Sequence, residues 1–154
     1  GGDPEFVATA EKTLALDPRN PEMLGLLGIL LAAYGDTVHA TELIDRAHAL
    51  TGQPRPMFNL GYVFAYLQED DGCAALPLAL ELDAPKWFIA PMVTAAAAGL
   101  CGDREAADAA RTRLLAIAPR FEAEFPALIE VWRFDPRLRD ALRRGLRQAG
   151  FEMR

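Results

Sequence analysis

The chain has 154 residues and a net charge of −6, which suits one soluble domain and argues against a general nucleic-acid-binding protein. Its longest apolar runs, residues 24–34 and 90–101, are shorter than the ~20 residues that span a bilayer, so no membrane partner is expected. The composition includes 28 alanines, which favour closely packed helices, and no serine, which removes the commonest hydrolase nucleophile.

The start of the chain does not read as natural sequence. Residues 1–6 lack a starting methionine, and Asp-Pro-Glu-Phe at 3–6 is what adjoining cloning sites encode. We interpret residues 1–6 as vector-derived and expect natural sequence from Val7 onward, with a further region upstream.

Helical periodicity, proline and glycine positions predict nine helices in chain order. The last of them is the clearest, because Asp135 is a good N-cap, Pro136 suits a first turn, and Leu138, Leu142 and Leu146 share one face. The expected ranges are about 7–16, 21–34, 37–50, 56–68, 72–82, 86–101, 104–117, 121–132 and 136–148.

Short phrases recur along the chain at a regular spacing. Gly-Asp-Thr-Val-His-Ala at 35–40 returns 67 residues later as Gly-Asp-Arg-Glu-Ala-Ala at 102–107. Leu-Ala-Leu-Asp-Pro at 14–18 returns as Leu-Glu-Leu-Asp-Ala-Pro at 80–85 and as Leu-Ala-Ile-Ala-Pro at 115–119. The glycines are expected where a helix ends and the chain reverses, and the prolines where one unit stops.

These phrases resemble the tetratricopeptide repeat (TPR) family, whose unit has ~34 residues. The unit at 21–54 carries the family pattern at Leu24, Leu27, Gly28, Leu31, Gly35, Ala40, Ile44 and Ala47. The unit at about 88–120 matches this pattern less completely. In the unit between these two, Glu69–Gly72 replaces the tight turn, and Pro77 is expected to interrupt the second helix.

The resemblance implies an all-α fold. It would be a right-handed α-α superhelix of about 3.5 TPR-like helical hairpins over residues 7–120, closed by two C-terminal capping helices over residues 121–154. The function it implies is non-catalytic: a scaffold that binds a protein or peptide segment in a concave groove.

In TPR arrays the ligand lies along the first helices of successive units. Placing that register on this chain predicts a groove rich in aromatic and sulfur-bearing side chains, which suits an apolar peptide. The alternative is that Phe58, Tyr62 and Tyr66 pack under neighbouring helices. The predicted groove residues are Arg55, Phe58, Asn59, Tyr62, Tyr66 and Met92, with Glu22 and Ile29 beside them.

A second candidate surface lies on the polar face of the last helix. Arg137, Arg143, Arg144 and Arg147 could meet an acidic partner, and the alternative is an ordinary solvated helix face.

No pattern of residues indicates an enzyme, a metal site or a cofactor. His39 and His48 lie nine residues apart on a helix expected to face outward, without the spacing of a helical metal site. Cys73 and Cys101 lack partners at metal-ligand spacing, and two cysteines suit buried thiols in a reducing cytoplasm better than a disulfide scaffold.

The C-terminal segment carries a further resemblance. Residues 119–135 and 145–151, with Ala84–Trp87, are similar to tails that close TPR regions following bacterial class III adenylate or guanylate cyclase domains or winged-helix domains. The chain is therefore expected to be a C-terminal fragment of a larger bacterial protein, binding a peptide or its own upstream domain. The alternative is a self-association module: helix 7–16 would lack its partner helix, which would leave apolar Val7, Leu14 and Leu16 exposed to a second copy in a homodimer. Sequence leaves open whether Trp132 and Phe134 fold back into the groove as an internal ligand mimic.

Overall fold

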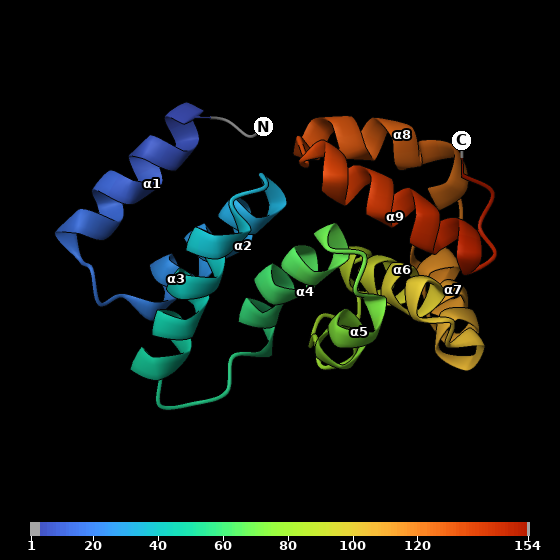
Figure 1. Cartoon of the computed structure of the whole chain (residues 1–154), viewed down its shortest axis with the longest axis horizontal. Coiled ribbons are helices and arrows are strands. Elements are labelled where there is room, and N and C mark those ends of the chain that lie inside the picture. Colours follow the sequence, from blue (N-terminus) through green and yellow to red (C-terminus); the bar gives the residue numbers. More distant parts are fainter. Residues whose placement is uncertain (1–3, 154) are drawn as a thin grey trace.

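The computed structural model describes residues 4–153, and within that range every regular element is a helix, which confirms the all-α prediction. None of the helices in this range is long and apolar enough to cross a membrane. The α-helices, shown in Figure 1, are α1 (Pro4–Leu16), α2 (Pro21–Ala33), α3 (Thr37–Leu50), α4 (Asn59–Gln68), α5 (Gly72–Leu80), α6 (Ile89–Cys101), α7 (Arg104–Ile117), α8 (Phe121–Trp132) and α9 (Pro136–Gln148).

Several boundaries differ from the predicted ones. The first helix begins at Pro4, inside the stretch interpreted as vector-derived, and α6 begins at Ile89 rather than near residue 86. The predicted helix 56–68 divides into a short 3-10 helix, η1 (Pro56–Phe58), followed by α4. The expectation that Pro77 interrupts its helix was wrong, because α5 runs through it to Leu80.

Three turns, joining α2 to α3, α4 to α5 and α6 to α7, share one hydrogen-bond pattern. Each ends in an aspartate, Asp36, Asp71 or Asp103, whose carboxylate accepts a bond from the backbone N–H three residues later, at 3.2, 3.0 and 3.0 Å. The backbone N–H of the same aspartate donates to a carbonyl five residues earlier, at 2.9, 2.9 and 3.0 Å. Each turn therefore ends one helix with a Schellman-type bond and caps the next.

The residue before each aspartate has a positive φ. Gly35 and Gly102 take values of 99° and 79°, as the sequence predicts for a chain reversal. In the middle turn Asp70 takes the same conformation at 58°. Aspartate tolerates the left-handed region better than most residues, so the turn that looks degenerate in sequence keeps the geometry of the other two.

The three turns produce helical hairpins α2–α3, α4–α5 and α6–α7, which pack in chain order. The first hairpin contacts the second through α2 and α3 against α4, and the second contacts the third through α5 against α6. Helix α1 packs on α2 at one end of this row (Figure 1).

Helix α6 forms the centre of the molecule. Every residue from Ile89 to Gly99 is buried, and the helix packs against α5, α7 and α9. Its second half begins with Ala95–Ala98 and Gly99, and these small residues allow neighbouring backbones to come close.

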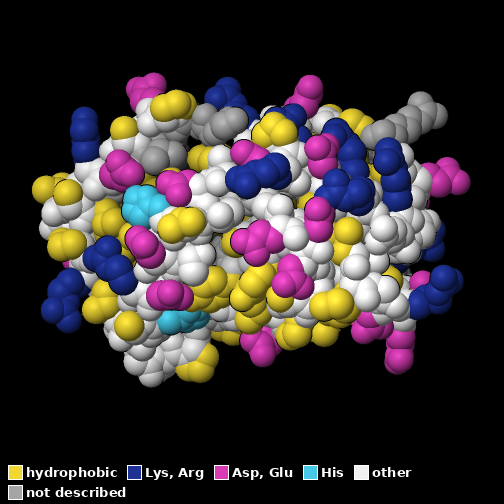
Figure 2. Space-filling model, in the orientation of Figure 1, with side chains coloured by type: hydrophobic (Ala, Val, Ile, Leu, Met, Phe, Trp, Pro, Cys, Tyr) yellow, Lys and Arg dark blue, Asp and Glu magenta, His cyan; other side chains and the backbone are white. Residues whose placement is uncertain are grey.

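Helix α9 lies directly against α6 through two glycines. A Cβ atom placed on Gly99 would lie 2.0 Å from the carbonyl oxygen of Gly145, and one placed on Gly145 would lie 2.3 Å from the carbonyl oxygen of Ala96. The leucine face predicted for α9 is fully buried, while its arginine face points outward, where basic side chains gather in Figure 2. The helix thus covers the middle of the molecule, in contrast to a cap placed beyond the last hairpin.

The segment before α9 joins it to the first hairpin. The backbone N–H of Asp135 donates to the carbonyl oxygen of Ala33 at 2.8 Å, and the guanidinium of Arg137 donates to the carbonyl oxygen of Gly35 at 3.0 Å. The ring of Phe134 is buried against Phe64 of α4, with centroids 5.4 Å apart. Residues 134–137 therefore contact α2, the turn after it and α4, and the role of Trp132 and Phe134 as an internal ligand mimic stays a hypothesis.

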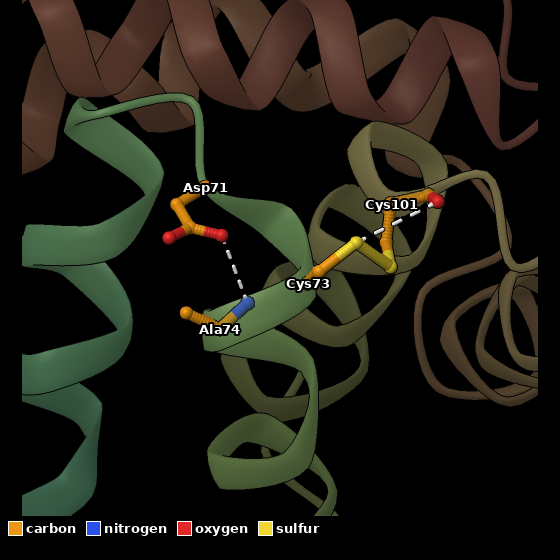
Figure 3. Close-up of a disulfide and its surroundings, with 4 residues drawn as sticks. All are labelled: Asp71, Cys73, Ala74 and Cys101. Carbon is orange, nitrogen blue, oxygen red and sulfur yellow. Dashed lines mark hydrogen bonds between the residues drawn. A yellow bond between two sulfur atoms is a disulfide. The ribbon is translucent and has the colours of Figure 1, made fainter.

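The cysteines form a disulfide, so the prediction of two buried thiols was wrong. Figure 3 shows the bond between Cys73, at the start of α5, and Cys101, at the end of α6. Gly72 allows the two helices to approach, since a Cβ atom there would lie 2.4 Å from the carbonyl oxygen of Ala97. Without the expected thiols, the cysteine count gives no argument for a reducing compartment.

We expect Gly145→Ala to lower the free energy of unfolding by about 1–3 kcal/mol, measured by urea denaturation. Alanine has the better helix propensity by about 1 kcal/mol, but its methyl group would overlap backbone atoms of α6 that no rotamer change can move. Gly52→Ala is the control, because its Cβ atom would meet nothing within 4 Å. Equal denaturation midpoints for the two variants would show that α9 does not need this contact.

Candidate functional site

The predicted groove residues do not form one surface. Phe58 and Met92 are only 4% and 2% exposed, so neither is available to a partner. The ring of Phe58 fills the space above Gly25, where a Cβ atom would lie 2.4 Å from the ring carbons. Met92 belongs to the buried run of α6. For Phe58 the structure agrees with the alternative that it packs under neighbouring helices.

Three other residues of the predicted set make intramolecular contacts. Arg55 forms an exposed ion pair with Glu22 at 3.0 Å, and Asn59 is hydrogen bonded to the imidazole of His48 at 3.1 Å. The hydroxyl of Tyr62 donates a short hydrogen bond to Asp45. Burial, followed by this bond and by the negative charge of Asp45, raises the pKa of Tyr62, so the phenol stays neutral.

His48 is not directed outward as predicted. Its ring is half-buried between two aromatic side chains, with centroids 5.6 Å from Phe58 and 5.9 Å from Tyr62. This stack fixes the position of the first turns of α4 against the end of α3. Tyr62 is therefore held by a ring contact on one side and by Asp45 at its hydroxyl.

An open groove lies between α3 and α4, with a volume of about 390 Å³. Two of the predicted residues, Tyr62 and Tyr66, belong to its α4 wall, and Val38, which is 74% exposed, belongs to its α3 wall. We call this feature the α3–α4 groove. Its lining consists of Thr37, Val38, Thr41, Glu42, Tyr62, Ala65, Tyr66 and Glu69.

Sequence reasoning missed the α3 wall of this groove. The prediction placed the binding surface along the first helices of the units, and α3 is the second helix of its unit. The signal was present, because Val38 is an apolar residue beside Thr37, Thr41 and Glu42 on the face of α3 that does not carry its buried stripe.

The arginines of α9 all have partners within the chain. Arg137 pairs with Asp135 at 3.3 Å, Arg143 with Asp140 at 3.7 Å, and Arg144 with Asp70. The side chain of Arg147 donates to the carbonyl oxygen of Met153 at 3.0 Å. Each of these arginines therefore already has a partner within the chain, and their role in binding an acidic partner stays a prediction.

The described residues contain no group of three or more His, Cys, Asp or Glu side chains placed to hold a metal ion. The α3–α4 groove contains no histidine, cysteine or lysine, and the hydroxyl of Tyr62 is already engaged with Asp45. This lining can bind a side chain of a partner, because it offers aromatic rings, aliphatic surface and two carboxylates.

Comparison with known proteins identifies no relative: no protein-family model, no curated protein and no solved structure matches this chain. The resemblances to TPR proteins and to cyclase-associated tails stay predictions.

We expect Phe58→Ala to lower the free energy of unfolding by about 3 kcal/mol, because it removes a buried ring and leaves a cavity over Gly25. Tyr66→Ala, at the open groove, should change it by less than about 0.5 kcal/mol. Urea denaturation followed by circular dichroism measures both. A fully stable Phe58→Ala variant would show that the ring is not part of the core.

Proposed function

We propose that this chain is a non-catalytic interaction module of TPR-like type, and that partners bind in the α3–α4 groove. The repeat assignment is supported by the three turns with one hydrogen-bond pattern and by the hairpins they produce. We propose further that about 3.5 such hairpins stack into a superhelical array.

The observation that carries the proposal is that this groove is open, while another face of the hairpins, on α4 and α6, is covered by α9. Helix α9 packs on α6 and α4, which are first helices of their hairpins, and Phe134 is buried against Phe64. A peptide could reach that face only by displacing α9. The groove lined by Tyr62, Tyr66 and Val38 requires no displacement.

The face of α4 and α6 that α9 covers is occupied by the chain itself. Residues 134–148 occupy it as a segment of the same chain, so α4 and α6 already hold an amphipathic helix in cis. We propose that a larger bacterial protein uses this chain as a C-terminal regulatory region, with its upstream domain or a separate protein as the partner of the groove.

Site-directed photo-crosslinking tests the groove. Val38 is replaced by p-benzoylphenylalanine and the protein is irradiated in a lysate of the organism that encodes it. We expect a crosslinked partner that disappears when Tyr66→Ala is added, because that change removes one wall of the groove.

The matched control places the same photoreactive residue at Val131, which is 77% exposed on α8. The same adducts from both positions, or an adduct at Val38 that Tyr66→Ala leaves unchanged, would contradict the groove as the partner site.

A second candidate function is self-association through α1 and α2. Helix α1 contacts α2, and the apolar side chains of Leu16 and Leu26 are exposed, the first at 89%. Leu14 is half-buried, and the side chain of Val7, which the sequence-based hypothesis also used, lies outside the described residues.

A hollow between α1 and α2 is lined mainly by apolar side chains: Met23, Leu26, Leu27 and Leu30, with Thr9, Ala10 and Thr13. Exposed apolar surface of this kind favours a second copy.

Sedimentation velocity over a wide concentration range tests this candidate. We expect dimers that dissociate on dilution and that Leu26→Glu abolishes, because a carboxylate would enter the apolar contact. Val131→Glu, on exposed surface elsewhere, controls for the added charge. A monomer at every concentration would exclude self-association.

A further inference from the structure

The charge of the α3–α4 groove is entirely negative. Glu42 and Glu69 are its ionisable residues apart from the two tyrosines, and no lysine or arginine lines it. Neither carboxylate forms an ion pair or a side-chain hydrogen bond with another described residue. The arginines of α9, in contrast, all have partners inside the chain. An occupant that carries a cation would therefore meet carboxylates that have no competing partner.

The aromatic wall suits the same kind of occupant. Tyr62 and Tyr66 lie one helical turn apart on α4 and both line the groove. The ring of Tyr62 is fixed by the stack on His48 and by the hydrogen bond to Asp45, so its position is set before any ligand arrives. A cation near the face of a tyrosine ring is attracted by the negative charge of the ring face, also at an exposed site.

The floor and the α3 wall add an apolar requirement. Ala65 and Val38 offer aliphatic surface that a compact ammonium ion would not cover. Arginine meets all three demands, because its methylene stem covers apolar surface, its planar guanidinium stacks on aromatic rings, and its N–H groups pair with carboxylates. Lysine has the stem and the charge but lacks the plane.

We propose that the α3–α4 groove binds an arginine side chain of a partner protein, with the guanidinium between the tyrosine rings and the carboxylates of Glu42 and Glu69. This inference rests on the proposed function and names the chemistry of its partner. The arginine stem lies against Val38 and Ala65, and flanking apolar residues of the partner extend along α3.

The test is a titration of the ¹⁵N-labelled chain with Ac-Leu-Arg-Leu-NH₂, followed by NMR. We expect saturable shifts of the amide signals of Thr41, Tyr62 and Tyr66, and no such shifts with the peptide that carries norleucine in place of arginine. The apparent affinity should fall roughly tenfold in the Glu42→Gln/Glu69→Gln double variant, as two weak ion pairs are lost. It should also fall as NaCl is added.

Glu81→Gln/Glu105→Gln is the matched control, since it removes the same charge at exposed positions outside the groove and should leave the affinity unchanged. Equal shifts with norleucine, equal affinity for the lysine peptide, or no loss in the Glu42→Gln/Glu69→Gln variant would overturn the assignment of arginine. If the arginine peptide does not bind while crosslinking at Val38 still captures a Tyr66-dependent partner, the groove function stands and this inference alone fails.

Discussion

The contact between the backbones of α6 and α9 is the constraint on which the rest of the structure depends. Gly99 and Gly145 bring the helices so close that a Cβ atom on either would overlap a carbonyl oxygen of the other helix. Helix α9 then buries its leucine face over the middle of the molecule, and residues 134–137 reach the end of α2. Helix α9 therefore covers α6 and part of α4, while the side of α4 that faces α3 stays open.

The α3–α4 groove depends on a second packing arrangement. Phe58 fills the space over Gly25, and the His48 ring stacks on Tyr62 and meets Phe58 edge-on, so α4 begins close to the end of α3. Toward the other end of the two helices, small and short side chains such as Ala65 and Thr41 leave space between them. Aromatic contacts thus close one end of the interface, and small side chains leave the other end open.

Sequence reasoning predicted local structure far better than the packing between elements. Gly35, Gly102 and the aspartates after them identify the turns because their conformational preferences act over a few residues. The burial of Phe58, the fold-back of Phe134 and the pairing of Cys73 with Cys101 depend on which helix covers which face. Periodicity shows that a helix face is apolar, but it does not predict which other helix packs on that face. For the same reason the sequence did not predict that α3 forms one wall of the groove.

The hydrogen bond from Arg137 to the carbonyl oxygen of Gly35 joins residues 102 positions apart, which has a consequence for how the protein is made. During synthesis the hairpins can form one after another from contacts close in sequence, because chains fold from the N-terminal side as they emerge. Helix α9 leaves the ribosome long after α2 and α4, so the apolar surfaces of α4 and α6 stay uncovered for much of that time. Over this interval the nascent chain offers chaperones a surface that the finished protein hides.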